Sequence, residues 1–335
     1  MVRLKIGKGL ANHLTEQKHV FSKTGHFCNL AVTHGWLSMA SRSVALVFSL
    51  LCFIWGSTWL GIKIGLEFLP PFLFAGIRFA VATISLMFLA RLLHARIPRS
   101  RSSWSVMLFL GVFQITIPYG LVFWGEQYIS SGLSAVLFAT LPFFVVIFAH
   151  LVVDEKLTKP KVLGVIASFL GLVAIFWSDA TVTQSITVQS SMFGGLAVVG
   201  SAAFGGLANV VAKRYAHEID PASNVLAQSM TGAVILSLLG LITERTTGLN
   251  FTFDAVAAIV YLGVVGSALG FLGLYWLLRE TTATNSSLIT FITPVVALIL
   301  GWLVLSEVPD PNVGVGAVLI LAGVYLTIKP PGRHF

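Results

Sequence analysis

The feature that most constrains this chain is a succession of long apolar stretches between Val44 and Ile328. A helix of about 20 apolar residues crosses a hydrocarbon core of roughly 30 Å. Inside a bilayer, only helices and closed barrels pair all of their own backbone polar groups. The stretches are continuously apolar, whereas barrel strands alternate in polarity. The pattern therefore predicts an all-α integral membrane protein.

The composition favours the same class, because 56% hydrophobic and 10% charged residues leave too little polar surface to solvate a globular chain of 335 residues. Charged, Gly-Pro and Ser-Thr breaks divide the apolar region into ten predicted transmembrane helices. These are residues 44–65, 71–90, 104–125, 130–152, 161–178, 191–212, 222–242, 254–278, 284–305 and 312–328. The weakest break separates the third and fourth spans, where Glu126 supplies the one charge.

Basic residues predict the orientation of these spans, since Lys and Arg of short loops stay on the cytoplasmic side. With the N-terminus inside, 18 of the 21 Lys and Arg residues fall on cytoplasmic segments. The other three are Lys63 at the outer end of the first span, Arg245 in an outer loop and Arg78 inside a span. We therefore predict a multi-pass protein of the cell membrane, bacterial inner membrane or plasma membrane, with both termini cytoplasmic.

The two ends of the chain differ from the apolar region. Residues 1–43 are basic and hold four of the eight histidines, so we predict a disordered cytoplasmic tail, with a second tail at 329–335. A metal site built from those histidines and Cys28 is disfavoured, because their spacing matches no compact ligand pattern. The residues after Met39 resemble the beginning of a membrane protein, so Met1 and Met39 are both candidate starts.

The apolar region contains two halves that repeat each other. A shift of 152 residues aligns 111–175 with 263–327 without a gap and leaves eleven identical positions. The identical pairs that are not aliphatic are Gly111 and Gly263, Trp124 and Trp276, Ser134 and Ser286, Pro142 and Pro294, Glu155 and Glu307, Gly164 and Gly316, and Gly171 and Gly323; a shift of 150 adds Gly56 and Gly206, Lys63 and Lys213, and Pro71 and Pro221. Each half, 44–178 and 191–328, has five predicted spans. The second half must therefore enter the membrane in the opposite orientation, as in the inverted repeats of many secondary transporters.

Several segments form a recognisable set. They are IWGSTWLGIKIGL (Ile54 to Leu66), the double proline Pro70–Pro71 followed by Arg78 in FAGIRF, Leu141–Pro142 followed by DEKLT, Thr293–Pro294, and Ser306–Glu307. Together with the span number, repeat length and orientation, this set resembles the EamA-type branch of the drug/metabolite transporter (DMT) superfamily over about 285 residues. The resemblance implies a ten-helix, exporter-like carrier with a central cavity lined by both halves. It implies a small-molecule substrate, such as an amino acid or related metabolite, without identifying it.

Two polar residues inside predicted spans are candidate substrate-binding groups. Arg78 lies seven residues past Pro71, which is roughly 10 Å of helix. Gln228 lies seven residues past Pro221 in the other half, so both should approach the midplane from opposite faces. A cation inside a span is costly unless it faces a partner, a cavity or water. We therefore expect Arg78 to attract a carboxylate or another anionic group and Gln228 to offer amide hydrogen bonds.

A structural role is the alternative for Arg78, which could cap carbonyls of a neighbouring helix or pair with Glu67 or Glu126. Other expected lining residues combine aromatic and polar side chains, as pockets for organic metabolites do. They are Trp55, Trp59, Tyr119, Gln114, Asn209, Ser267 and Tyr275. Trp55 and Trp59 are one helical turn apart on one face, so we expect their helix to lie beside the cavity. Packing is the alternative role for several of these side chains.

The energy source is left open by the sequence. Proton-driven antiport commonly uses a buried carboxylate, and no clear acidic residue lies within the predicted spans, where Glu126 and His150 are the nearest candidates. Uniport or exchange fits equally well. Glu155 and Glu307 stand at span ends and are expected to fix helix ends and loops.

Other classes of function are less well supported. An intramembrane enzyme would need a nucleophile with a base, paired carboxylates or a metal constellation, and the sequence shows no such pattern, nor one for a cofactor. A membrane scaffold or receptor without transport is the remaining alternative. The net charge of +8 follows from the predicted topology, so it indicates no nucleic-acid partner. The expected partners are the lipid bilayer and a small solute, and a monomer with both repeats is sufficient.

Overall fold

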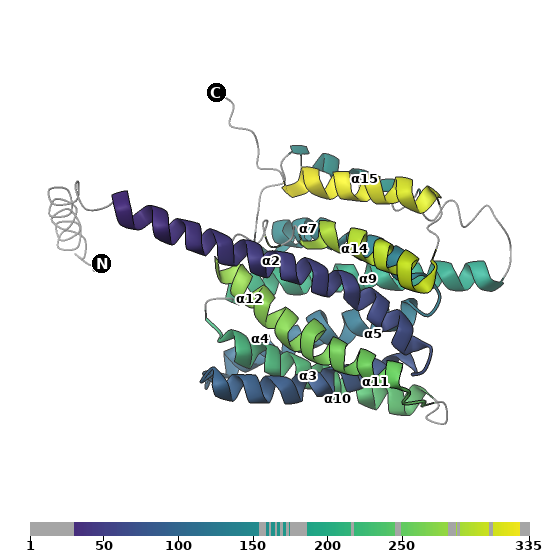
Figure 1. Ribbon diagram of the computed structural model, residues 1–335, viewed down its shortest axis with the longest axis horizontal. Helices are drawn as coiled ribbons and strands as arrows, with labels where there is room; N and C mark the ends of the chain where they lie inside the picture. The colour runs from purple at the N-terminus through teal and green to yellow at the C-terminus, as the bar shows by residue number, and fades with distance from the viewer. Residues whose placement is uncertain are drawn as a thin grey trace, which may run out of the picture. The chain divides into compact units, whose positions relative to one another are not determined.

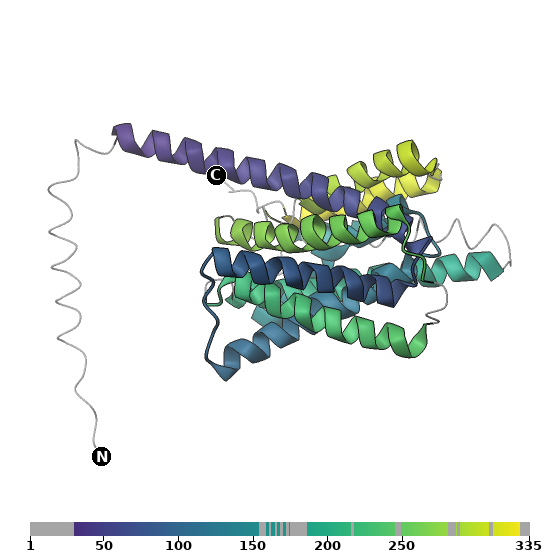
Figure 2. The ribbon, with the colours of Figure 1, turned by 60° about the horizontal axis from the view of Figure 1, so that its bottom comes forward.

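The part of the chain that the computed structural model describes is helical (Figure 1, Figure 2). It comprises residues 30–153, 186–215, 218–244, 249–280, 289–307 and 311–328, together with Ser286 and part of 159–174. The chain divides into two compact units, Met1–Leu46 and Val47–Phe335. All of the contacts reported below lie within the second unit.

Two long helices of this part change their winding midway. In chain order the helices are α2 (Leu30–Leu66), α3 (Pro71–Leu92), α4 (Arg101–Leu110), η1 (Gly111–Thr116), α5 (Ile117–Gly125), α6 (Ser131–Phe138), α7 (Leu141–Val153), α9 (Ile186–Tyr215), α10 (Pro221–Thr243), α11 (Phe253–Val260), η3 (Tyr261–Leu269), α12 (Gly270–Glu280), α14 (Ile289–Leu305) and α15 (Pro311–Ile328). Segments η1 and η3 are π-helical. They join α4 to α5 and α11 to α12 without a break, and they fall at equivalent places in the two repeats.

Seven helices among the described residues are long and apolar enough to cross a membrane. They are Arg42–Leu66, Pro71–Leu92, Arg101–Gly125, Ser131–Leu151, Gln189–Tyr215, Pro221–Thr243 and Phe253–Glu280. Two shorter apolar helices, Ile292–Leu305 and Gly314–Gly323, fall in the last two predicted spans. The all-helical class is confirmed. The count of ten stays a prediction, because most of the fifth predicted span lies outside the described residues. The cytoplasmic orientation of the termini also stays a prediction.

The predicted tails lie largely outside the described residues, which exclude 1–29 and 329–335 and so three of the four tail histidines and Cys28. Helix α2 begins at Leu30, upstream of the first predicted span, whereas the membrane-spanning candidate within it begins at Arg42. Glu155 also lies outside the described residues.

The weak break between the third and fourth predicted spans is confirmed. Helix α5 ends at Gly125 and α6 begins at Ser131. The Ser130 side chain caps α6, because its Oγ accepts a hydrogen bond from the Leu133 backbone N–H at 3.2 Å. Such caps satisfy one of the amide groups that a helix start leaves unpaired. The fourth span is not one continuous helix, since a turn separates α6 from α7 just before Pro142.

Glycines bring the two halves into close reciprocal contact. A Cβ added at Gly56 would lie 2.5 Å from Val296, and one added at its repeat partner Gly206 would lie 2.8 Å from Phe144, the repeat partner of Val296. A Cβ added at Gly111 would likewise lie 2.7 Å from Thr231, and one added at its repeat partner Gly263 would lie 2.7 Å from Val81, the repeat partner of Thr231. Small residues at such crossings let helix backbones approach closely. The repeat seen in the sequence is therefore also a repeat of packing contacts.

Helices α3 and α10 pack against each other along their length, and they run antiparallel. Gly76 near the start of α3 packs against Ser237 near the end of α10. The Glu244 carboxylate, just after α10, accepts hydrogen bonds from the backbone N–H groups of Phe72 at 2.7 Å and Leu73 at 2.9 Å. These amides belong to the first turn of α3, where no intrahelical partner exists.

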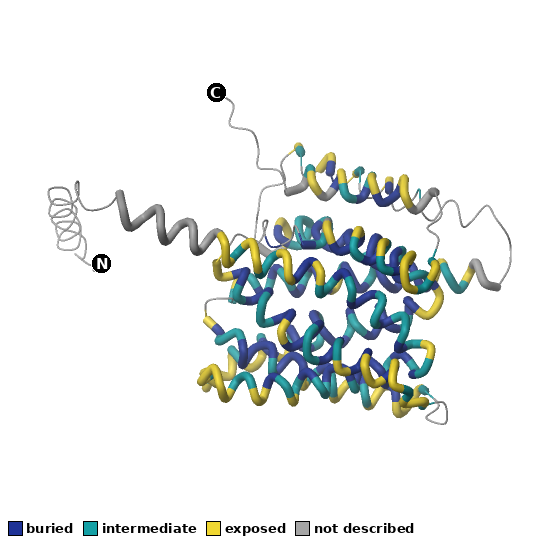
Figure 3. Tube along the Cα trace, viewed as in Figure 1, coloured by how far each residue is buried: buried dark blue, intermediate teal, exposed yellow. Residues whose placement is uncertain are grey.

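Burial varies around the helices as expected for a protein solvated by lipid (Figure 3). Phe74 and Phe79 on α3 are fully buried, whereas Phe88 on the same helix is 64% exposed and Ile242 on α10 is 81% exposed. Large apolar side chains are stable at such exposed positions when hydrocarbon replaces water around them. The exposed apolar faces thus mark the surface available to the bilayer, and the buried faces enclose the polar residues described next.

Candidate functional site

Arg78 lies in the interior, on the buried face of α3. Its side chain is 1% exposed. Nε donates a hydrogen bond to the Ser267 Oγ at 2.9 Å. The guanidinium carbon lies 4.7 Å from the centre of the Tyr119 ring and 5.6 Å from that of Phe123, distances at which a cation and an aromatic face attract each other. Aromatic rings and the Ser267 hydroxyl therefore hold this cation in place.

One amino group of Arg78 has no hydrogen-bond partner among the described residues. Nη1 is buried and forms no hydrogen bond to any described residue. The structural alternative is that Arg78 caps carbonyls of a neighbouring helix or pairs with Glu67 or Glu126. Among the described residues Arg78 forms no ion pair with either acid, and the Glu67 side chain is exposed. The guanidinium thus keeps a buried donor available.

Gln228 lies on α10 in a second polar group. Its Nε2 donates to the Asn224 Oδ1 at 2.8 Å and to the Tyr275 hydroxyl at 2.9 Å. The Tyr275 hydroxyl in turn donates to the Gln114 Oε1 at 3.1 Å. The Gln228 Oε1 is buried and accepts no hydrogen bond from a described residue. This chain of side chains leaves one buried acceptor available, just as Arg78 leaves one donor.

The two polar groups occupy equivalent places in the repeats. Arg78 and Gln228 are repeat partners by the shift of 150, and Phe123 and Tyr275 are repeat partners by the shift of 152. Arg78 therefore packs on the aromatic residue whose counterpart hydrogen-bonds to Gln228. Equivalent positions carry different chemistry, a cation on one side and an amide on the other.

The π-helical segments supply a residue to each group. Gln114 comes from η1 and Ser267 from η3, and both are buried. A π-helix has one more residue in each hydrogen-bonded turn than an α-helix, and such segments occur frequently at functional sites. These π-helical segments were not predicted from the sequence.

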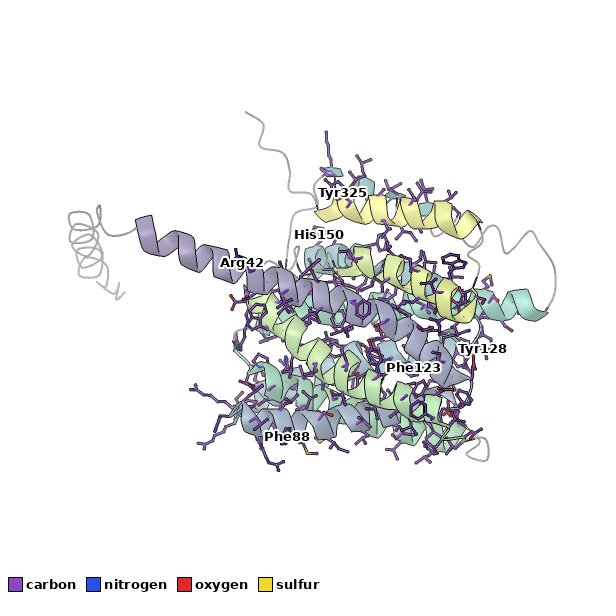
Figure 4. All side chains as sticks on the ribbon, in the orientation of Figure 1. Arg42, Phe88, Phe123, Tyr128, His150 and Tyr325 are labelled. Atoms are coloured by element: carbon purple, nitrogen blue, oxygen red, sulfur yellow. The ribbon has the colours of Figure 1, made fainter. Side chains whose placement is uncertain are left out.

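The predicted aromatic residues divide into those that reach Arg78 and those that do not. Tyr119 stacks edge-to-face on Phe79 at 4.8 Å and contacts Arg78. Trp55 donates from Nε1 to the Gly266 carbonyl at 3.1 Å, next to the residue that binds Arg78. Trp59 packs instead against Phe138, with ring centres 5.5 Å apart. Figure 4 shows Phe123 inside the bundle.

Asn209, which we expected to line the cavity, is half-buried on α9. No hydrogen bond joins its side chain to the network within the described residues. Sequence reasoning missed Asn224 and Phe123, although each could have been found. Asn224 stands four residues before Gln228 on the same helix face, and Phe123 is the repeat partner of Tyr275.

A buried acid lies at the end of α5, beside the Arg78 group. The Glu126 side chain is 0% exposed, and neither carboxyl oxygen has a hydrogen-bond partner among the described residues. Burial raises the pKa of this carboxyl well above its ordinary value of 4.5; nearby Lys63 and Arg78 lower it by less, and Glu307 adds to the rise. The Lys63 Nζ donates to the backbone carbonyls of Glu126 and Ile129, each at 2.8 Å.

Helices of membrane-spanning length that bury a cation and an amide between two repeated halves define a polytopic membrane protein with an internal polar site. The model of the EamA-like transporter family matches residues 42–177 and 192–329, which together exceed half of the chain. The protein belongs to this family, as the motifs of the first span and the paired prolines indicated. It is a multi-pass membrane protein of a transporter family.

Three curated relatives each match more than four fifths of this chain. The uncharacterized transporter YoaV of Bacillus subtilis is 29% identical over 273 residues, or 82% of this chain and 92% of YoaV. An uncharacterized transporter of Archaeoglobus fulgidus is 27% identical over 287 residues, or 85% and 98% of the two chains. Protein PagO of Salmonella typhimurium is 24% identical over 290 residues, or 87% and 94%. The family and the names of the first two relatives indicate transport rather than catalysis.

A solved crystal structure shares the fold. The TM-score is 0.61 at 17% sequence identity, over 85% of this chain and 96% of the other. At this identity the likeness concerns the architecture alone.

Proposed function

We propose that the protein exports a small organic metabolite with a carboxylate or another anionic group, such as an amino acid, by alternating access between its two halves. The observation that carries the proposal is a pair of buried groups at repeat-equivalent positions, the Arg78 Nη1 and the Gln228 Oε1, which have no hydrogen-bond partner in the part of the chain that the structure describes. Leaving a buried polar group unpaired costs about 1–3 kcal/mol, and more when the group is charged. A bound solute that supplies the missing partners recovers this energy.

The two groups suit different parts of one solute. Arginine presents parallel N–H donors that match a carboxylate or phosphate, and the bonds are charge-assisted. The free amide oxygen of Gln228 is an acceptor that suits an ammonium or hydroxyl group. An amino acid carries both kinds of group, which is why it heads the substrate class.

The spacing of the two groups favours their use in succession. Gly76 packs against Ser237 and the two helices are antiparallel, so the backbone of Arg78 lies level with residue 235 of α10, seven residues from Gln228 along that helix. Seven residues are roughly 10 Å along the helix axis. This axial separation suits a solute that meets the two groups in turn. We infer that Arg78 contacts the solute when the site opens to one side and Gln228 when it opens to the other.

The membrane arrangement belongs to the same proposal. Ten spans in two inverted five-helix repeats, with cytoplasmic termini, place Arg78 toward the outer side and Gln228 toward the inner side of a central cavity. The membrane is the bacterial inner membrane or the plasma membrane, and a monomer suffices. Support comes from the distribution of basic residues and from the reciprocal glycine contacts between the halves.

Counterflow in proteoliposomes tests the proposal. Vesicles are preloaded singly with unlabelled amino acids, organic acids, nucleosides or cationic drugs, and exchange with the labelled compound is followed for the wild type, Arg78→Lys and Arg78→Gln. Arg91→Gln is the matched control, because Arg91 lies on the same helix and is exposed. We expect exchange of carboxylate-bearing solutes, at least about tenfold weaker in affinity for Arg78→Gln, which corresponds to about 1.4 kcal/mol, and unchanged for Arg91→Gln.

Other outcomes would change the conclusion. Exchange of cations that Arg78→Gln leaves unaltered would remove Arg78 from the site but keep the carrier. An absence of exchange for every solute, with a protein shown to be folded, would favour a scaffold or receptor. Accessibility labelling of single cysteines at both termini, in a Cys28- and Cys52-free background, tests the proposed topology independently.

A further inference from the structure

The unexplained feature of the interior is the Glu126 carboxyl, because the transport site described above does not use it. Both of its oxygens are buried and lack a hydrogen-bond partner among the described residues. An ionised carboxylate is strongly disfavoured in such surroundings unless it is paired and hydrogen-bonded. The conformation described here therefore holds Glu126 as the neutral acid.

Three charged groups on neighbouring elements act on this carboxyl: Lys63 on α2, Arg78 on α3 and Glu307 after α14. The first is engaged elsewhere, since the Lys63 ammonium donates to two backbone carbonyls. Glu307 is also held, because its carboxylate accepts hydrogen bonds from the Ser131 N–H at 3.1 Å and Oγ at 2.6 Å. The cations that could stabilise a charged Glu126 are near it, but in this conformation none forms an ion pair with it.

The opposite half of the protein lacks this acid. Lys213 is the repeat partner of Lys63, and its Nζ donates to the Leu278 carbonyl at 3.2 Å. Leu278 is the repeat partner of Glu126. The same lysine-to-carbonyl contact therefore forms in both halves, and a carboxyl accompanies it in one half only. The acid is not needed to make the contact.

We propose that Glu126 is a proton-binding site and that its protonation is coupled to closure of the end of the protein where Lys63 holds the chain after α5. The inference rests on the proposed transport function and adds its coupling ion. When this end closes and the cavity opens to the opposite side, the carboxylate takes a proton from water on the opposite side and an O–H bond forms. When this end opens, Lys63 and water stabilise the carboxylate, the O–H bond breaks, and the proton is released to water at this end.

The sign of the pH dependence follows from burial. Because the pKa of Glu126 is raised in the closed conformation and returns toward 4.5 when the carboxyl meets water, low pH favours closure. The preference for the closed conformation is fully present below about pH 4.5, the ordinary pKa of the carboxyl. It declines as pH rises from there through the raised pKa of the closed conformation. Transport of a solute by this alternation is then coupled to the proton gradient across the membrane.

Protonation itself is measurable without a substrate. We would record infrared spectra of the purified, reconstituted full-length protein at pH 7 and subtract the spectrum of Glu126→Gln. We expect the wild type to show the carbonyl stretch of a protonated carboxyl that Glu126→Gln lacks. Glu67→Gln is the matched control, because Glu67 is exposed at the same end of the molecule, and this variant should keep the band. A difference spectrum without a lost carboxyl band would overturn the proposal.

Coupling is measured next, with a solute that gives counterflow. A pH gradient of one unit should drive accumulation of up to about tenfold if one proton moves per solute. We expect gradient-driven accumulation to disappear in Glu126→Gln while counterflow at equal pH is retained, because glutamine is a neutral isostere of the acid found here. Counterflow with no response of the wild type to a pH gradient would refute coupling and leave the transport function standing. Loss of counterflow in every variant, wild type included, would instead refute the transport function.

Discussion

A methyl group added at Gly266 is predicted to collide with one specific neighbour, and a second substitution should relieve the collision. The Cβ of Gly266→Ala would lie 2.8 Å from the Thr58 Cγ2, and 3.5 Å from the Arg78 Nη2, which is ordinary contact. Thr58 cannot easily turn aside, because it is buried and its Oγ1 donates to the Trp55 carbonyl at 2.8 Å. Thr58→Ser keeps this hydroxyl and removes the methyl.

The expected magnitudes follow from these contacts. Overpacking of this kind costs about 1–3 kcal/mol, and replacing glycine by alanine in a helix returns about 1 kcal/mol, so Gly266→Ala should lose about 1 kcal/mol. Thr58→Ser should lose about 1 kcal/mol of buried methyl. The double variant should fall near the wild type, because one methyl replaces the other. The coupling energy is therefore about 2 kcal/mol in the favourable direction.

The free energy of unfolding is measured by titrating the four proteins with SDS in mixed micelles. Gly314→Ala serves as the control, since a Cβ there meets nothing within 4 Å, and it should not destabilise the protein. Strictly additive single effects, or a Gly266→Ala protein as stable as the wild type, would refute the packing described between α2 and η3.

Three further stability predictions use the same measurement. Glu244→Ala should lose about 1–2 kcal/mol, because it removes the acceptor of two amides at the start of α3, whereas Glu67→Ala should change little; equal effects would contradict the cap. Tyr275→Phe should lose about 1–3 kcal/mol, because it leaves the Gln114 oxygen without its donor; the control Tyr325→Phe lies on an exposed face, where a similar loss is not expected (Figure 4). Lys63→Met should lose about 1.5–3 kcal/mol with its two charge-assisted bonds, and full stability of this variant would show that they contribute nothing.

Much of the fold could be predicted from the sequence, because a bilayer makes local hydropathy decisive. The family followed from short motifs, and the repeat followed from identical non-aliphatic residues such as Gly111 and Gly263. The structure supplies the physical reason for that identity, since each glycine packs at an equivalent helix crossing. The start of α6 could likewise be placed from the small polar turn before it.

The rest depended on information that hydropathy does not contain. The π-helical winding of η1 and η3 is a matter of backbone hydrogen-bond register, which side-chain polarity does not specify. The bond from Arg78 to Ser267 joins two halves whose relative rotation the sequence does not fix. Glu126 looked like a loop residue because it follows the last apolar residue of its span, and only the packing around it shows that it is buried.

The π-helical segments have a mechanical consequence. A π-helix has more residues in each turn than the 3.6 of an α-helix, so each of its residues turns the chain by less than the roughly 100° of an α-helical residue. If η1 rewound as α-helix, the residues after it would rotate about the helix axis relative to the residues before it, and Gln114 would turn away from Tyr275, to which it is now hydrogen-bonded. The same holds for η3 and Ser267. The two halves thus carry π-helical segments at equivalent places, and rewinding of either segment would turn one polar side chain of the site away from its partner.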